Sequence, residues 1–294
     1  MLLDELECTL CLVESRLRQI ARTGLTQEKV RKFFSFLSSL DLRNRTLAFA
    51  KSYEFVLTLN DGEDIYRDQK QKIRDRFLTM LRQVQSQPLN IWRAIRWAVN
   101  ANLLDVEMPT YRPDIEQIVT KLDSEVHIRA CRDIVQLIEE SQNVYYALDN
   151  VGEHLFDLLF VKLLVEQGKS VTLLVRGRPY EIDVTYDMLV KDLELMNLHG
   201  TVQVIVRDDF MPPLLSLSEM STSSGTVVIS KGIANLEAYL NYADKLEKFN
   251  IVFLLTAKCA PLARFFSVPQ GSGIVVDSYF LNQLIRDKFS RDVT

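Results

Sequence analysis

Side chains that could hold a metal ion and a phosphate follow the apolar runs in the second half of the sequence. Asp149 and Asn150 directly follow the run Tyr145–Leu148, and Lys231 and Lys258 follow two later runs. Carboxylate and amide oxygens are hard ligands that suit Mg²⁺ or Mn²⁺. A lysine ammonium is a compact positive charge for phosphate oxygens. Together these residue types are the ones that recur in phosphoryl transfer.

Further polar side chains stand near the ends of these runs and extend the candidate site. Arg176, a candidate substrate contact, and Asp183 follow the second run. Asn235 lies in the helical stretch after Lys231, whose first backbone N–H groups would face an anion. The carboxyl ends of parallel strands meet at one edge of a sheet, so we expect all these side chains to converge there. Each also has a structural interpretation: Asp149 as a helix N-cap, Asp183 as a turn residue, and the lysines as solvated strand ends.

The pattern between residue 144 and the C-terminus predicts the elements that must position these side chains. Short apolar runs alternate with helical patterns, which is typical of a mostly parallel sheet with helices on both faces, a three-layer α/β/α arrangement. The first two runs flank a helical pattern that ends at Gly168, and this order predicts one βαβ unit. The predicted strands are Tyr145–Leu148, Val171–Val175, Val202–Val206, Thr226–Ile229, Ile251–Leu255 and Ile274–Val276.

The sequence from Leu2 to about Gln136 shows helical periodicity throughout, which predicts a helical layer or subdomain. We therefore divide the chain into a helical N-terminal domain, residues 1–136, and an α/β domain that binds metal and phosphate, residues 137–294. Thr26 is the expected N-cap of the second helix. The predicted helices cover residues 3–20, 30–40, 46–59, 64–81, 90–101 and 114–122, with Pro109 and Pro113 in a loop.

The composition excludes several classes of partner. The chain has 294 residues, 47% of them hydrophobic and 25% charged, as in ordinary globular proteins. Its net charge of −4 gives no electrostatic case for a nucleic acid or an anionic membrane, and no apolar run reaches the ~18 residues that span a bilayer. The acidic N-terminus has no signal-peptide cleavage site, so we expect a cytoplasmic protein with reduced thiols. The oligomeric state stays open.

Motifs spread over nearly the whole chain are similar to those of one known family. The second half contains, in order, Asp149-Asn150-Val151-Gly152-Glu153 with Asp157, Arg176-Gly177-Arg178-Pro179 before Asp183-Val184-Thr185, Ser230-Lys231-Gly232-Ile233-Ala234-Asn235-Leu236-Glu237, and Lys258-Cys259. The first half contains Cys8-Thr9-Leu10-Cys11, the segment Asp64–Lys70, and Asn102-Leu103-Leu104-Asp105. This set resembles the damage-control phosphatases, a metal-dependent family also known as domain of unknown function 89, and in particular their short archaeal and bacterial branch with an N-terminal CxxC.

The resemblance implies a helical part packed on an α/β domain, and a phosphatase for small phosphorylated metabolites such as damaged sugar phosphates. It implies a divalent metal, Mg²⁺, Mn²⁺, Co²⁺ or Ni²⁺, held by Asp149, Asn150 and Asp183. Lys258 and Lys231 would contact the phosphate. The residues leave open whether water or Asp149 itself attacks the phosphorus. Other side chains implied to line the pocket are Asn102, Asp105, Glu153, Asp157 and Asn235.

Two positions depart from the family pattern and keep other functions open. Ile182 stands where the family usually has Asn, and Ala234 where it usually has Gly. These departures favour, as the alternative, a metal- or metabolite-binding protein without turnover. An S-adenosylmethionine-dependent carboxyl methyltransferase is a further alternative, although no glycine-rich loop that would bind such a ligand follows a predicted strand. The same absence disfavours a nucleotide-binding Rossmann enzyme. Val151 stands where a haloacid-dehalogenase-like phosphatase needs a second Asp.

Cys8 and Cys11 form a separate candidate site. They lie on one side of the predicted first helix, where they could bind a metal or change redox state. No second CxxC or His pair completes a zinc site, so packing is the favoured interpretation of both thiols.

Overall fold

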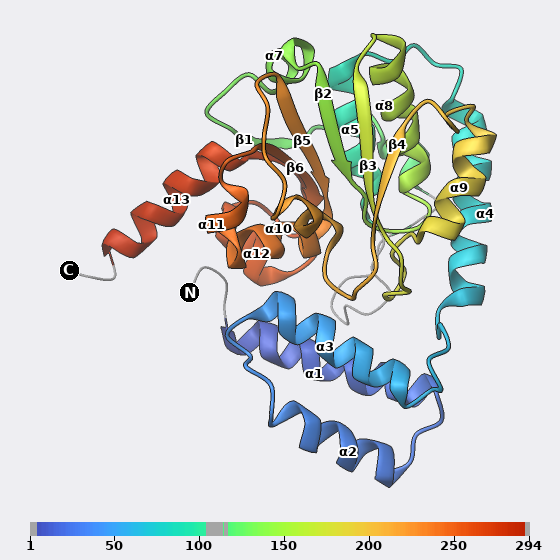
Figure 1. Ribbon diagram of the computed structural model, residues 1–294, viewed down its shortest axis with the longest axis vertical. Helices are drawn as coiled ribbons and strands as arrows, with labels where there is room; N and C mark the ends of the chain where they lie inside the picture. The colour runs from blue at the N-terminus through green and yellow to red at the C-terminus, as the bar shows by residue number, and fades with distance from the viewer. Residues whose placement is uncertain (1–4, 104–113, 115–116, 292–294) are drawn as a thin grey trace.

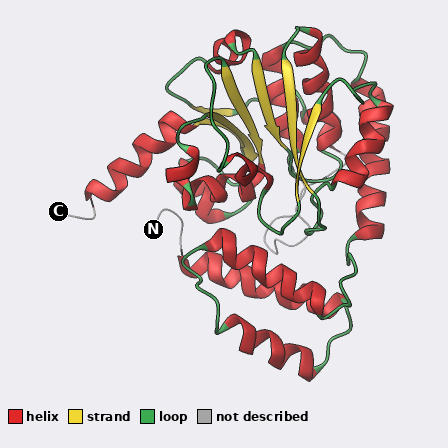
Figure 2. Cartoon of the chain, viewed as in Figure 1, coloured by secondary structure: helices red, strands yellow, loops and turns green. Residues whose placement is uncertain are grey.

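The computed structural model describes residues 5–103, 114 and 117–291, and its centre is one β-sheet (Figures 1 and 2). Within these residues the sheet has seven strands in the order β1-β7-β6-β5-β2-β3-β4, and every neighbouring pair is parallel except β6 with β7. All six predicted strands are present, and the mostly parallel α/β fold is confirmed. The strands are β1 (His127–Arg129), β2 (Asn143–Ala147), β3 (Ser170–Arg176), β4 (Gln203–Arg207), β5 (Thr226–Lys231), β6 (Asn250–Thr256) and β7 (Gly273–Asp277).

The helices predicted in the first half of the chain are present, and Thr26 caps the second of them, accepting a hydrogen bond from Lys29 N at 3.2 Å. The helix predicted over residues 114–122 is only a short α6 within the described residues, and Pro109 and Pro113 lie outside them. None of the described helices is both long and apolar enough to cross a membrane. The helices are α1 (Glu5–Arg22), α2 (Gln27–Leu37), α3 (Arg45–Thr58), α4 (Arg67–Val84), α5 (Ile91–Ala101), α6 (Ile118–Lys121), α7 (Ile134–Glu140), α8 (His154–Glu166), α9 (Tyr186–Leu195), the 3₁₀ helix η2 (Pro213–Leu217), α10 (Gly232–Asn241), α11 (Ala243–Leu246), α12 (Ala260–Phe266) and α13 (Ser278–Arg291).

The prediction that the chain is all helical up to residue 136 is wrong at β1. This strand pairs in parallel with β7, with His127 beside Ile274. It has only three residues and lies at an edge of the sheet, so it is too short to show an alternating apolar pattern. The main hydrophobic core also continues across residue 136, from Trp97 to Val144. The division into two domains at that residue stays a prediction.

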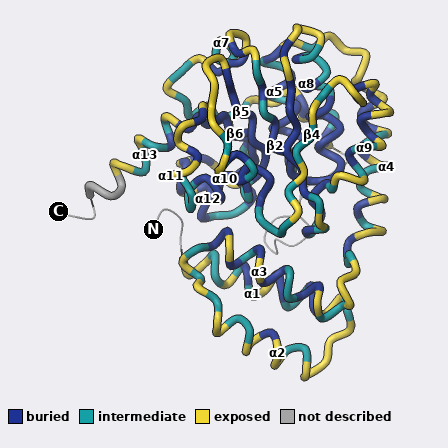
Figure 3. The backbone as a smooth tube through the Cα atoms, in the orientation of Figure 1, coloured by how far each residue is buried: buried dark blue, intermediate teal, exposed yellow. Residues whose placement is uncertain are grey.

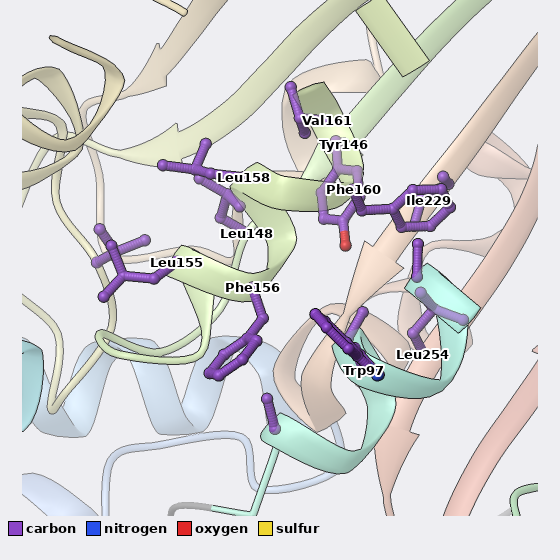
Figure 4. Packing of buried hydrophobic residues seen from close by; sticks show 14 of the residues in the cluster. Trp97, Tyr146, Leu148, Leu155, Phe156, Leu158, Phe160, Val161, Ile229 and Leu254 are labelled. Carbon is purple, nitrogen blue, oxygen red and sulfur yellow. The ribbon is translucent and has the colours of Figure 1, made fainter. Parts of the chain in front are cut away.

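The central strands are buried along most of their length (Figure 3). Alternate residues face opposite sides of the sheet, and each side carries its own apolar layer. In β6, Leu254 joins the core beneath α5 and α8, whereas its neighbour Phe253 joins the core beneath α10 and α12. Figure 4 shows the first of these layers, where the rings of Trp97 and Phe156 meet edge to face with centroids 6.3 Å apart. Burial on both faces explains why these strands are continuous apolar runs in the sequence.

Helices α1 and α3 lie beyond the carboxyl ends of the strands, with α2 on their outer side (Figure 1). Arg16 of α1 is fully buried and ties this helical layer to the loop after β3. Its guanidinium donates to Glu181 Oε1 at 2.6 Å and to the Tyr180 hydroxyl at 3.0 Å. Its Nε also donates to Ser52 Oγ of α3 at 2.8 Å. One guanidinium thus holds α1 against both α3 and the α/β part.

A buried polar cluster joins α4, α8 and α9 on one side of the sheet. Asp192 is fully buried, accepts hydrogen bonds from Arg74 Nε at 3.0 Å and lies 2.9 Å from His154 Nε2. Gly152 N donates to His154 Nδ1 at 3.0 Å, so Nε2 carries the proton that Asp192 accepts. Burial raises the pKa of Asp192, but the hydrogen bonds from His154 and Arg74 outweigh burial and leave the pKa below its ordinary value.

We expect Asp192→Ala to lower the free energy of unfolding by about 3 kcal/mol, because Arg74 and His154 lose their buried partner. The matched control is Asp187→Ala at an exposed position of the same helix, which should change it by less than about 0.5 kcal/mol. Urea denaturation measures both. Because folding lowers the pKa of Asp192, the loss of unfolding free energy in Asp192→Ala should be largest at neutral pH. It should shrink as the pH falls through the pKa of Asp192 in the folded protein. Equal effects of the two substitutions would refute the role of this cluster.

Candidate functional site

A short antiparallel bridge between Asn150 and Asp183 brings the polar residues after β2 beside those after β3. Val184 N donates to the carbonyl of Asp149 at 2.9 Å and extends this bridge. Asn150 Nδ2 donates to Asp149 Oδ2 at 2.8 Å. The structural interpretation of Asp149 as a helix cap is wrong, because the N-cap of α8 is Glu153. The side chains predicted to hold a metal are therefore neighbours.

These residues line a cavity of about 370 Å³ between the strand ends and the helical layer. Helices α1 and α3 form one wall of the cavity, and the first turns of α10 and α12 form part of the other. A cavity of this size suits a small metabolite. The predicted site residues that line it are Asp149, Asn150, Arg176, Asp183 and Lys258.

Other residues of the cavity wall were not singled out by sequence analysis. Phe49 comes from α3, Tyr180 from the loop after β3, and Phe210 from the loop after β4. No chemical motif marks them, since they are ordinary apolar or aromatic residues that only the folded chain brings together. Glu237 also lines the cavity, where Arg45 Nε lies 3.3 Å from its carboxylate. Its place at the end of the motif beginning at Ser230 could have revealed it.

Gly232, the first residue of α10, lies directly against the carboxylate of Asp149. A Cβ atom added at Gly232 would be 1.9 Å from Asp149 Oδ2, and the φ angle of Gly232 is +75°. Only glycine fits both conditions without strain. The carboxylate therefore meets the N-terminus of a ten-residue helix, where backbone N–H groups favour negative charge. Ala234, where the family usually has Gly, lines the cavity.

The Asp149 carboxylate is buried beside other carboxylates. It is 6% exposed, and burial together with Glu153 and Asp183 raises its pKa well above the ordinary value, while Lys258 and Lys231 oppose that shift. Burial likewise raises the pKa of Asp183, although Arg176 opposes it. The site thus concentrates negative charge in a place with little water, and a bound cation would relieve this repulsion.

Arg176 orients Asp183 from inside the protein. Its Nε donates to Asp183 Oδ2, and its Nη1 donates to the carbonyls of Phe210 and Met211 at 2.8 and 2.9 Å. Its guanidinium carbon also lies 4.2 Å from the centre of the Tyr180 ring. With these contacts Arg176 positions a carboxylate, whereas the predicted substrate contact of Arg176 stays a prediction.

Several predicted pocket residues form a second, fully buried cluster behind Asp149. Lys231 Nζ donates to the carbonyl of Ala98 at 2.7 Å and to Asp157 Oδ1 at 2.9 Å. Burial raises the pKa of Asp157 to about 6, and its Oδ2 has no hydrogen-bond partner among the described residues. Glu153 Oε1 lies 3.5 Å from Lys231 Nζ. Lys231 is therefore enclosed by protein groups and is not one of the residues that line the cavity.

Asn102 joins the two clusters. Its Nδ2 donates to Glu153 at 2.7 Å and to Asp149 Oδ2 at 3.1 Å, and its Oδ1 accepts from Thr256 N at 3.1 Å. Asp105, predicted beside it, lies outside the described residues. Asn102 thus positions the candidate ligand Asp149 from the side away from the cavity.

The side-chain amide of Asn235 is hydrogen-bonded to three backbone groups. Its Oδ1 accepts from Leu214 N at 2.9 Å, and its Nδ2 donates to the carbonyls of Leu148 and Lys231 at 3.1 and 2.8 Å. This amide holds the ends of β2 and β5 together behind the cavity. Ile182, one of the two departures from the family pattern, lies between the cavity residues Glu181 and Asp183, but its own side chain is 3% exposed and belongs to the hydrophobic core.

The donor set fits a hard divalent cation. Asp149 and Asp183 offer carboxylate oxygens and Asn150 an amide oxygen, the ligand type that Mg²⁺ and Mn²⁺ prefer. Among the described residues no three His, Cys, Asp or Glu side chains gather in a metal-holding group. A metal here would therefore rely on the two carboxylates, the amide and oxygens from water or substrate, as is common for Mg²⁺.

Comparison with known proteins gives consistent results. The family model described as the damage-control phosphatase ARMT1-like domain matches residues 5–274. A damage-control phosphatase of Pyrococcus horikoshii is 28% identical over 193 residues, which cover 64% of this chain and 65% of that protein. A protein of Archaeoglobus fulgidus with the same name is 33% identical over 138 residues, 45% of each chain.

Longer matches extend over most of the chain. An uncharacterized protein of Methanocaldococcus jannaschii is 22% identical over 295 residues, 92% of this chain and 94% of that protein. The crystal structure of a DUF89 family protein from Pyrococcus horikoshii superposes with a TM-score of 0.72 at 22% identity, covering 92% of this chain and 97% of that one. The chain therefore belongs to the damage-control phosphatase ARMT1-like domain family.

Proposed function

We propose that this protein is a metal-dependent phosphatase that hydrolyses small phosphate esters, such as damaged or unwanted sugar phosphates. One observation carries the proposal: the neighbouring carboxylates of Asp149 and Asp183 line a metabolite-sized cavity together with Lys258. The names of the archaeal relatives support a phosphatase rather than a methyltransferase. A cytoplasmic location stays a prediction of the sequence.

The roles of the residues follow from their positions. Asp149, Asn150 and Asp183 would hold the divalent cation, and Arg176 orients Asp183. When bound, such a cation polarises a phosphoryl oxygen and acidifies water. Lys258, which is 4% exposed and lines the cavity, would stabilise negative charge on the phosphoryl oxygens. Burial, Glu153 and Asp183 raise the pKa of Asp149, and the buried ammonium of Lys231 opposes that shift from behind.

Phosphate release tests this proposal. We expect release from a panel of small phosphate esters with at least one of Mg²⁺, Mn²⁺, Co²⁺ or Ni²⁺, and a fall to background when the metal is chelated. Asp183→Ala should stay inactive even at saturating metal, because it removes one of two carboxylate ligands. Tight metal binding without hydrolysis of any ester would instead favour the binding-protein alternative. Undiminished phosphate release after chelation would refute the proposed metal dependence.

A further inference from the structure

The cysteine pair of α1 lines the same cavity as the proposed metal ligands. Cys8 lies in the first turn of α1 and Cys11 in the second, and both are half-buried cavity residues. Cys259 lines the cavity too, directly after Lys258. Cys8 packs against the edge of the core beneath α10 and α12, in line with the packing role favoured from the sequence, but neither Cys8 nor Cys11 is deeply buried. Thiols at a cavity wall are instead accessible to small reactants.

The spacing of the pair favours redox chemistry over metal binding. Among the residues that the structure describes, Cys8, Cys11 and Cys259 are not part of a group of three metal-binding side chains. Cys8 and Cys11 are three residues apart on a helix, so their Cβ atoms are neighbours at ~5–6 Å. A disulfide needs ~3.5–4.5 Å between these atoms, so it can form only if the start of α1 distorts. Such a strained disulfide is easily reduced.

A Cys8–Cys11 disulfide would distort the part of α1 that forms the cavity wall. Beyond the pair, α1 is fixed by Arg16, whose guanidinium is bonded to Ser52 and Glu181. The part of α1 before Arg16 is held more loosely, because the ion pair between Glu7 and Arg264 at 2.7 Å joins two side chains that are 45% and 56% exposed. That part supplies Cys8, Leu10 and other residues of the cavity wall.

We propose that Cys8 and Cys11 form a reversible disulfide that restricts this cavity and lowers turnover, an inference that rests on the proposed phosphatase function. The oxidant is a small-molecule disulfide such as oxidised glutathione. One thiolate attacks it to give a mixed disulfide and releases one glutathione thiol. The second thiolate then displaces the other glutathione, so the Sγ–Sγ bond forms and two glutathione thiols take up both electrons and both protons.

The test treats the reduced full-length chain with oxidised glutathione, and then with dithiothreitol. Peptide mass mapping should find a Cys8–Cys11 disulfide, metal-supported phosphate release should fall by about tenfold or more, and dithiothreitol should restore it. In Cys8→Ser the ratio of reduced to oxidised activity should become one, whatever its basal activity. Cys131→Ser, at an exposed position away from the cavity, is the matched control and should keep the wild-type ratio.

The two hypotheses fail separately. A reduced chain that hydrolyses no ester refutes the proposed phosphatase, while mass mapping, which needs no turnover, still decides whether the pair forms. Absence of the Cys8–Cys11 disulfide, a disulfide through Cys259 instead, or a disulfide that leaves phosphate release unchanged would each overturn the redox inference.

Discussion

Asp149→Asn should lower phosphate release by at least about 10²-fold, the scale seen when one preorganised charged or polar group is removed from an active site. The substitution keeps the size of the side chain. It removes the negative charge that lies against Gly232 at the start of α10. It also removes one of the two carboxylates of the proposed metal site, so metal affinity measured by calorimetry should fall in parallel.

The same variant should remain folded. In the metal-free protein burial of the Asp149 carboxylate, together with repulsion from Glu153 and Asp183, raises its pKa. Removing one of these mutually repelling carboxylates is therefore not expected to lower the melting temperature, as is common where function costs stability. The matched control is Asp208→Asn, which also follows a strand of the sheet but has a side chain 79% exposed. Equal activity of Asp149→Asn and wild type would exclude Asp149 from catalysis.

Gly232→Ala should disrupt the site from the backbone side. The new methyl group would fall 1.9 Å from Asp149 Oδ2, and the residue would keep a φ of +75°, which L side chains rarely adopt. Either α10 or the carboxylate must move. A displacement near 1 Å at the reacting groups can cost about 10²-fold in rate, so we expect a loss of that order in phosphate release.

Gly200→Ala separates the effect of the clash with a neighbouring side chain from the effect of the positive φ angle. Gly200 has a φ of +77° but nothing within 4 Å of the added Cβ, so its substitution has only the conformational cost, about 1–2 kcal/mol in the free energy of unfolding. Gly232→Ala should be more destabilising than this control, and only Gly232→Ala should lose activity and metal affinity. If the two alanine variants were equally active, the contact between Gly232 and Asp149 would have no part in the reaction.

Local patterns in the sequence were sufficient for most of the elements. Strands β3, β5, β6 and β7 are buried on both faces, so each is an apolar run between polar turns. Thr26 could be recognised as a cap because its hydrogen bond reaches only to Lys29. The three-residue strand β1 could not be recognised from the sequence, because its position depends on pairing with β7, far along the chain.

The candidate site was partly predictable for the same reason. Asp149 and Asp183 lie close together because parallel strands end at one edge of the sheet, a rule that needs only the order of elements. The sequence by itself thus determined the fold class, the family resemblance and the edge at which polar groups gather.

Only the tertiary structure decided which of those groups line the cavity. Lys231 and Lys258 both follow apolar runs, but Lys231 is the last residue of β5 and meets Asp157 from α8, whereas Lys258 lies beyond the end of β6 and lines the cavity. The contact of Gly232 with Asp149 and the cavity wall made by α1 likewise join segments distant in sequence. The physical reason is that contact depends on the packing of whole elements, which no local pattern encodes.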